Sequence, residues 1–91
     1  MKAKRVIFEG RVQGVGFRYA VKDLARGFDV VGWVKNLPDG SVELQVMGDE
    51  AELDGFLREI TGESALAGNI RHVRVDEIPP LADCRSFQIL R

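Results

Sequence analysis

The sequence has 91 residues, of which 45% are hydrophobic and 30% are charged, and its formal net charge at pH 7 is -1. This composition predicts one small globular domain over residues 1–91, and the charge excludes a general electrostatic attraction to nucleic acid or to an anionic membrane. No segment approaches the ~20 apolar residues of a membrane span, and the basic start lacks the apolar core of a signal peptide, so we expect a cytoplasmic protein with no membrane partner.

The chain contains one cysteine, Cys84, and one histidine, His72. A single cysteine cannot form an internal disulfide, and neither residue has neighbours with the spacing of a metal site. We interpret Cys84 as structural and His72 as a surface residue. The sequence therefore predicts no metal and no cofactor.

The first predicted elements are a strand, a glycine-rich loop and a helix. Residues 4–9 (KRVIFE) are β-branched and aromatic and stop at Gly10, as a strand that enters a loop would. From Phe17 the apolar residues recur at helical spacing, and Gly27 is placed to end the helix.

A β-hairpin is predicted next, over residues 29–47, with its turn at LPDG. In its second strand the apolar residues at 42, 44 and 46 alternate with Glu43 and Gln45, so one face should be buried while the other meets water. We interpret Trp33 and Val34 in the first strand as core residues.

The remaining elements complete a fold. Helical periodicity returns over residues 49–60, where Asp49 and Glu52 have the spacing of a capping box. Residues 61–69 are interpreted as a loop, 70–78 as a strand, 79–84 as a turn and 85–91 as a short terminal strand. The order βαββαβ predicts the α+β ferredoxin-like split βαβ sandwich, in which two helices cover one face of an antiparallel sheet, here with an extra C-terminal strand.

The segment GRVQGVGFR at residues 10–18 has the features of an anion site. Its glycines permit a backbone nest of N–H groups, the helix that follows contributes its positive N-terminal end, and Arg18 adds a planar charged fork. The first 18 residues are also basic, because Glu9 alone opposes Lys2, Lys4, Arg5, Arg11 and Arg18. Glycine loops before helices are common, however, and the segment matches neither the P-loop nor the dinucleotide pattern, so the pattern alone leaves a purely structural loop open.

Two segments together resemble a known family. The run GRVQGVGFR at 10–18, followed by GWVKNLPDGSVEL at 32–44, closely resembles the two signature segments of the acylphosphatases. The resemblance implies an enzyme, a hydrolase that splits the carboxyl–phosphate bond of a small acyl phosphate into a carboxylate and inorganic phosphate. It also implies that the first segment binds phosphate and that Arg18 is catalytic.

The resemblance assigns a second catalytic residue, Asn36, to the positioning of the attacking water. An amide that can both donate and accept hydrogen bonds suits that task, although an asparagine near Pro38 can also serve only as a turn former. The phosphate oxygens are expected to bind the side chain of Arg18 and the backbone N–H groups of Gln13, Gly14, Val15, Gly16 and Phe17. Inorganic phosphate should be both the product and a competitive inhibitor, and we expect a monomer.

Two other classes of function stay open. The first is a non-catalytic anion-binding or carbamoyl-phosphate-handling module, as in larger maturation proteins that carry an acylphosphatase-like domain; the short chain and its single cysteine favour a stand-alone enzyme. The second is a ferredoxin-like RNA-binding domain. Such a domain needs exposed aromatic residues on a basic sheet face, whereas the strands here present Glu43 and Gln45.

Overall fold

A computed structural model describes residues 1–91, except for the side chain of Glu63. The elements follow in the order β1 (Lys2–Gly10), α1 (Phe17–Ala25), β2 (Val30–Asn36), β3 (Val42–Gly48), α2 (Glu50–Arg58), a π turn η1 (Glu59–Glu63), a 3-10 turn η2 (Ala67–Asn69), β4 (Ile70–Ile78) and β5 (Phe87–Leu90). The five strands form one sheet in the order β4-β1-β3-β2-β5. This is the predicted α+β ferredoxin-like fold with its additional C-terminal strand.

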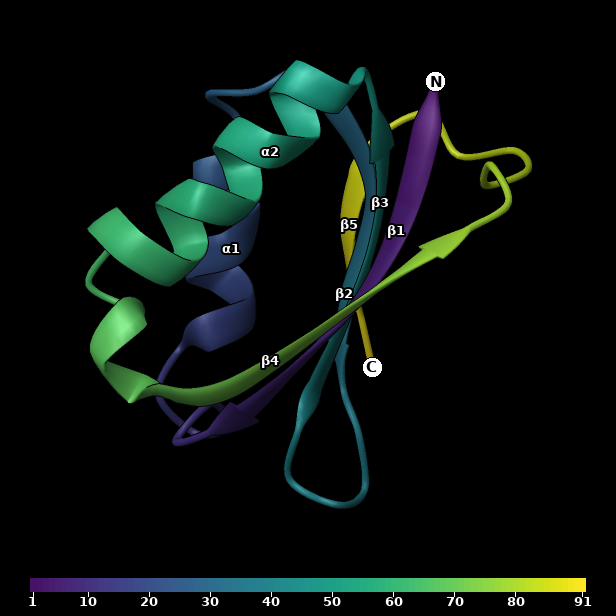
Figure 1. Cartoon of the computed structure of the whole chain (residues 1–91). Coiled ribbons are helices and arrows are strands. Elements are labelled where there is room, and N and C mark those ends of the chain that lie inside the picture. Colours follow the sequence, from purple (N-terminus) through teal and green to yellow (C-terminus); the bar gives the residue numbers. More distant parts are fainter.

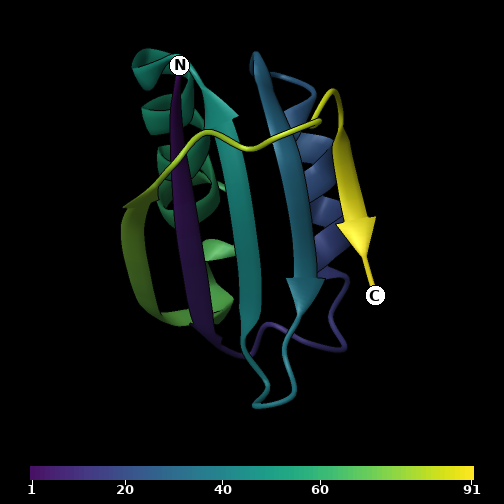
Figure 2. The same cartoon turned by 90° about the vertical axis from the view of Figure 1, so that its right-hand side faces the viewer.

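The pairing of the strands is antiparallel except at one edge. β1 lies between β3 and β4, β2 pairs with β3, and β5 runs parallel to β2 along its outer side. Both helices cover the same face of this sheet (Figure 1). The opposite face has no helix, and the segment that connects β4 to β5 crosses it near one end (Figure 2).

The core lies between the sheet and the two helices. Alternate residues of the strands point toward the helices; Phe8 and Leu44 are the largest fully buried side chains among them, and Val34 is fully buried as well. α1 contributes Phe17, which packs on Phe8 with the ring centroids 5.2 Å apart, and α2 contributes Phe56. The periodicities of two in the strands and 3.6 in the helices therefore produce one continuous apolar layer.

The start of α2 differs from the prediction in its hydrogen bonds. Asp49 is the N-cap residue, but its side chain makes no capping hydrogen bond. The Glu52 carboxylate does not reach back to it, because Glu52 Oε1 accepts a hydrogen bond from the backbone N–H of Asp29 at 2.7 Å. The predicted helix is correct and the predicted capping box is wrong.

The expected loop at residues 61–69 is also partly helical. α2 continues into η1, and η2 follows after a short turn. Hydroxyl groups explain the continuation: Thr61 donates to the carbonyl of Leu57 at 2.8 Å, and Ser64 donates to that of Ile60 at 2.9 Å. Ile60 is fully buried, so core packing holds this turn in place.

The helix-free face of the sheet is less exposed than predicted. Glu43 is only 6% exposed, because Arg5 Nε donates to its carboxylate at 2.6 Å and Gln45 Nε2 donates at 3.0 Å. Trp33 lies on this same face, half-buried, with Lys35 Nζ 5.3 Å from its ring centroid. The interpretation of Trp33 as a core residue is therefore wrong, while that of Val34 is confirmed.

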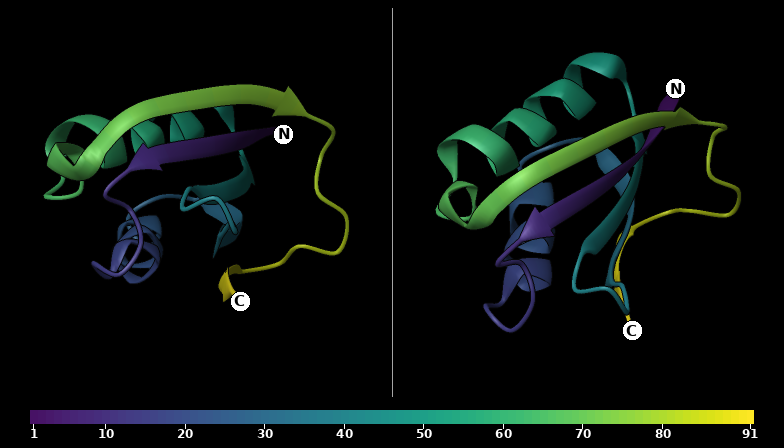
Figure 3. Two further views of the ribbon diagram at one scale, coloured as in Figure 1. Left: turned by 90° about the horizontal axis from the view of Figure 1, so that it is seen from below. Right: turned by 60° about the horizontal axis from the view of Figure 1, so that its bottom comes forward.

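One end of the sheet gathers the segments that the sequence analysis singled out. The loop from β1 to α1, the turn from β2 to β3 and the last residues of β5 all lie at this end, as the two views of Figure 3 show. They are far apart in the sequence. The split βαβ topology brings them together, because β1 and β2 both end here.

Candidate active site

The loop after β1 turns sharply at two glycines. Gly14 and Gly16 have φ angles of 75° and 73°, in the left-handed region that favours glycine, and a Cβ atom at either position would meet open space. Gly16 is also the N-cap residue of α1. Backbone conformation, and not crowding, is therefore the reason for glycine at these two positions.

The amides of this loop are available to a ligand. Within the described residues, the backbone N–H groups from Gln13 to Phe17 donate to no protein acceptor. The last of them belong to the first turn of α1, whose N–H groups have no intrahelical partner and carry the positive end of the helix dipole. This arrangement favours an oxyanion in the loop.

Arg18 lies in the first turn of α1, next to the C-terminal strand. Its Nη1 atom donates to the backbone carbonyl of Leu90 at 2.9 Å. Because a guanidinium has five N–H donors, this one contact orients the group and leaves the others for a ligand. β5 thus positions a side chain that is 72 residues earlier in the sequence.

Asn36 is the last residue of β2. Its position two residues after the buried Val34 places its side chain on the helix-covered face of the sheet. The Oδ1 atom is buried and accepts no hydrogen bond from the described part of the chain. A buried acceptor without a donor is costly, so this atom marks a place where a hydrogen-bond donor is expected to bind.

The structure brings Arg18 and Asn36 to one pocket of about 130 Å³, roughly the share of four water molecules in the liquid. The pocket is lined by Val12, Gln13, Gly14, Gly16, Phe17, Arg18, Tyr19 and Asn36. Val15, at the tip of the loop between the two glycines, is not among them and is exposed. The pocket has room for a small tetrahedral anion and a water.

The residues around this pocket limit its chemistry. Its lining holds no carboxylate, imidazole or thiol, and His72, as predicted, is exposed on β4. Among the described residues no group of histidine, cysteine, aspartate or glutamate side chains could hold a metal ion. The arrangement can bind an anion and orient a water, and it offers no carboxylate, imidazole or thiol as a nucleophile or a general base.

Sequence reasoning missed the side chain of Gln13. Its Nε2 atom donates to two backbone carbonyls of the β2–β3 turn, those of Leu37 and Ser41, each at 2.8 Å. These bonds fasten the loop to the strand that carries Asn36. No local signal reveals them, because the partners are 24 and 28 residues away.

Tyr19 is the other lining residue that the motif did not indicate. It follows Arg18 in α1 and is 66% exposed at the mouth of the pocket. The helical periodicity offers a signal in this case, since Phe17, Ala20 and Val21 occupy the apolar stripe and leave Tyr19 outside it.

Comparison with known families agrees with this geometry. A family model described as Acylphosphatase matches residues 4–89. The chain belongs to the acylphosphatase family. The resemblance inferred from the two motifs is therefore confirmed, and with it the expected class of enzyme, a hydrolase.

Individual relatives support the assignment over most of their length. An acylphosphatase from Methanospirillum hungatei is 46% identical over 77 residues, which cover 85% of each chain. The crystal structure of acylphosphatase from Bacillus subtilis is 37% identical, covers both chains completely and superposes with a TM-score of 0.89. The chain is thus similar to acylphosphatases in both sequence and fold.

A larger protein contains a similar unit. The structure of T. kodakarensis HypF is 33% identical, has a TM-score of 0.85 and matches all of this chain, but the match covers only 12% of HypF. The acylphosphatase fold therefore occurs both as a short chain and as part of a long one. Among the described residues no helix is long and apolar enough to cross a membrane.

Proposed function

We propose that the protein hydrolyses the carboxyl–phosphate bond of acyl phosphates, giving a carboxylate and inorganic phosphate, with the phosphoryl group in the pocket of Arg18 and Asn36. One observation carries this proposal. Two residues from different elements, one a permanent cation and the other a buried amide with an unpaired oxygen, line the same small pocket beside a loop of unpaired amides. Membership of the acylphosphatase family supplies the reaction.

The phosphoryl oxygens bind to the loop and to Arg18. The N–H groups of Gln13, Gly14, Val15, Gly16 and Phe17 and the guanidinium of Arg18 act as donors to the equatorial oxygens. These donors are in place before substrate arrives, and their effect grows as negative charge develops on the oxygens in the transition state.

Asn36 holds the attacking water through its unpaired Oδ1. The water oxygen attacks phosphorus on the side opposite the leaving carboxylate, the bond from phosphorus to the acyl oxygen breaks, and the carboxylate leaves with the electron pair. One proton of the water passes to a phosphoryl oxygen, because the pocket lining supplies no carboxylate or imidazole to accept it. The fixed position of this water opposite the leaving group accelerates the reaction further, in addition to the stabilisation of the phosphoryl oxygens.

Several finer expectations belong to the same proposal. The chain acts as one acylphosphatase-like domain over residues 1–91, as a monomer in the cytoplasm, without metal or cofactor. Inorganic phosphate competes with the substrate for the Arg18 pocket. We expect chelator treatment to leave kcat unchanged and equilibrium sedimentation to give the mass of one 10.1 kDa chain.

A second function is a non-catalytic anion-binding module. The likeness to a segment of HypF favours this alternative, since a domain within a larger protein can bind an anion for chemistry that occurs elsewhere in that protein. The two functions differ in turnover and not in phosphate binding.

Steady-state hydrolysis of benzoyl phosphate in water enriched in oxygen-18 tests the proposal. We expect rapid turnover, competitive inhibition by inorganic phosphate, and the label in the phosphate product, because water attacks phosphorus. Label in benzoate would place the attack on the carbonyl carbon and contradict the assigned geometry. Phosphate binding without turnover would favour the anion-binding module.

A further inference from the structure

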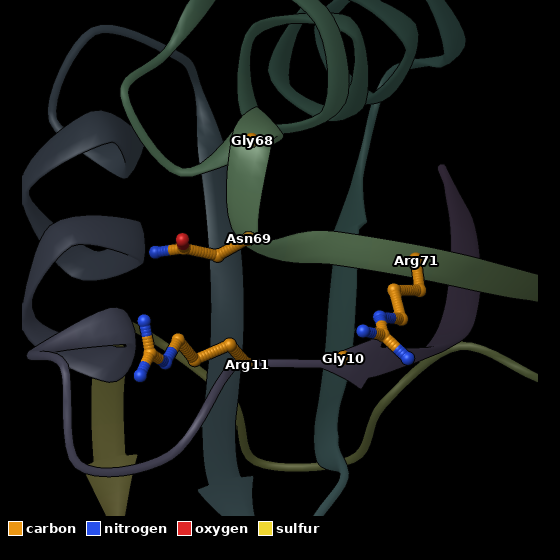
Figure 4. A pocket seen from close by; sticks show the side chains of 5 residues that line it. All are labelled: Gly10, Arg11, Gly68, Asn69 and Arg71. Carbon is orange, nitrogen blue, oxygen red and sulfur yellow. The ribbon is translucent and has the colours of Figure 1, made fainter.

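A second pocket lies beside the end of β1. It has a volume of about 680 Å³ and is lined by Gly10, Arg11, Gly68, Asn69 and Arg71 (Figure 4). These residues come from two segments, the exit of β1 and the junction of η2 with β4. None of them lines the Arg18 pocket.

Backbone contact forms the floor of this pocket. Gly10 has a φ of 132°, and a Cβ atom there would clash with the carbonyl oxygen of Asn69 and lie 2.8 Å from the backbone nitrogen of Arg71. The next residue closes the junction, because the N–H of Arg11 donates to the same Asn69 carbonyl at 2.8 Å. At Gly68 a Cβ atom would meet open space. The pocket is thus a hollow over a fixed backbone junction.

The polar side chains of the pocket are without protein partners. Within the described part of the chain, the guanidinium groups of Arg11 and Arg71 form no ion pair, and the side-chain amide of Asn69 forms no hydrogen bond. In contrast, Arg74, three residues after Arg71 on the same strand, lies 3.2 Å from the Asp76 carboxylate. The pocket thus brings together, from two segments of the chain, two cations without an ion-pair partner among the described residues, beside the side-chain amide of Asn69.

The side chains are arranged around the hollow from both segments. In the view of Figure 4, Arg11 and Asn69 both extend toward α1, while Arg71 lies over Gly10. The nearest carboxylate in the sequence, Glu9, lines an adjoining pocket with Asp39 and Ser41, and the two pockets share Gly10. The lining of the second pocket therefore contains positive charge and amide donors without a neutralising acid.

We propose that this second pocket binds an oxyanion, a phosphate or a carboxylate, separately from the phosphoryl group in the Arg18 pocket. Guanidinium groups are suited to bidentate contact with such groups. The two pockets are neighbours, since Arg11 is only two residues before Gln13 and their Cα atoms are at most about 7 Å apart. Two sources offer this chemistry: a second anionic group on the acyl part of a substrate, and a separate small anion.

Binding is tested first, with inorganic phosphate as the probe. In a titration followed by amide NMR shifts, Gly68 and Asn69 are expected to report the second pocket, and Gly14 and Gly16 the Arg18 pocket. We expect both sets to saturate, and Arg71→Gln and Arg11→Gln to remove the shifts at Gly68 and Asn69 while those at Gly14 and Gly16 persist. The matched control is Arg74→Gln, which removes an equal charge from the same strand outside the pocket. No saturable shift at Gly68 and Asn69 in the wild type overturns the proposal.

The source of the anion is tested second, by comparing acetyl phosphate with succinyl phosphate, whose acyl group carries an additional carboxylate. This arm rests on the proposed hydrolysis. If the substrate supplies the anion, Arg71→Gln lowers kcat/KM for succinyl phosphate about threefold to tenfold, as expected for one exposed charged contact. The same variant changes kcat/KM for acetyl phosphate less than about twofold. If Arg71→Gln changes kcat/KM by the same factor for both substrates, and the phosphate shifts are saturable, the pocket binds a separate anion.

Different results would contradict the proposed hydrolysis and the proposed second pocket. Absence of turnover with both substrates contradicts the proposed hydrolysis but leaves the phosphate shifts at Gly68 and Asn69 as the measure of the second pocket. Normal turnover together with shifts that Arg74→Gln removes as fully as Arg71→Gln overturns the second pocket, because general surface charge would then explain them. A preserved amide spectrum establishes that each variant is folded.

Discussion

Two clusters of polar side chains in this molecule differ in how completely the protein satisfies them. On the helix-free face of the sheet, the Glu43 carboxylate accepts hydrogen bonds from Arg5 Nε at 2.6 Å and from Gln45 Nε2 at 3.0 Å. It also forms an ion pair with Lys35 Nζ at 4.0 Å. In the Arg18 pocket, Asn36 Oδ1 has no donor among the described residues, and the loop amides have no acceptor. Groups that the chain pairs internally support the fold, and groups that it leaves unpaired are available to a ligand.

The electrostatics of the first cluster agree with a structural role. Burial alone raises the pKa of Glu43, but the hydrogen bonds from Gln45 and Arg5 and the charges of Arg5 and Lys35 outweigh it, so the pKa lies below its ordinary value of 4.5. The carboxylate is therefore ionised and held by its partners at neutral pH. Such a group contributes to the free energy of unfolding and not to turnover.

The largest expected effect is that of Arg18→Gln. Loss of a preorganised charged donor in the pocket should lower kcat/KM for benzoyl phosphate by about 100- to 1000-fold, or about 3 to 4 kcal/mol. Arg18→Lys, which keeps the charge but not the fork, should also lose most activity. Steady-state kinetics check both variants. Wild-type activity in either variant would show that the Arg18 guanidinium takes no part in the reaction. The Arg18 pocket would then not differ in function from the Glu43 cluster.

Asn36→Ala should have the next largest effect, mainly on kcat. Because the amide holds water and not the phosphoryl group, we expect kcat to fall about 100-fold, the order of loss that misplacement of a reacting group causes. The inhibition constant of phosphate should change little. The same measurements in Arg18→Gln provide the comparison, since there both quantities should worsen. A parallel loss of kcat and phosphate affinity in Asn36→Ala would assign Asn36 to anion binding.

Gln13→Ala tests whether the fastening of the loop matters. The variant loses two hydrogen bonds from Gln13 Nε2 to the turn carbonyls, each contributing about 1 kcal/mol. We expect the free energy of unfolding to fall by about 2 kcal/mol and kcat/KM to fall roughly tenfold, because the amides of the loop remain but are less well ordered. Urea unfolding and kinetics measure the two effects. A loss of stability with full activity would show that catalysis does not depend on the two hydrogen bonds from the Gln13 side chain.

Glu43→Gln should produce the smallest effect, and only on stability. At pH 7 we expect the free energy of unfolding to fall by about 1 kcal/mol, with kcat unchanged. Because the pKa of Glu43 is lower in the folded state, its contribution is present above pH 4.5 and disappears as the pH falls through the folded-state value. The difference between wild type and variant should therefore shrink in urea unfolding below pH 4.5. A difference that grows toward acid would reverse the sign of the assigned shift.

The sequence was sufficient to predict the order of elements and the two motifs of the site. Apolar periodicity located the strands and helices, the glycines with Arg18 indicated an anion site, and the resemblance to acylphosphatases added Asn36 to it. The errors have physical causes. Asp49 and Glu52 have capping-box spacing, but Glu52 bonds instead to Asp29, 23 residues away. Trp33 is apolar like its neighbours, and only the pairing of β2 shows which face it occupies.

Contacts between distant residues account for what sequence reasoning did not find. The Leu90 carbonyl that orients Arg18 belongs to a strand with no motif of its own, 72 residues away. Arg11 and Arg71 line the second pocket together because the backbone at Gly10 lies close to that of Asn69 and Arg71, and no local sequence pattern predicts this close approach. Such contacts depend on the topology of the sheet. Local sequence patterns predict the order of the strands and helices but not which distant residues meet.

The separate roles of Arg18 and Asn36 are best tested by comparing wild type with Arg18→Gln, Asn36→Ala and Glu43→Gln in one experiment. It measures kcat for benzoyl phosphate and the inhibition constant of phosphate. We expect Arg18→Gln to impair both quantities, Asn36→Ala to lower kcat alone, and Glu43→Gln to change neither. Turnover that depends on Glu43 as strongly as on Arg18, or that survives the loss of Arg18, would contradict these roles.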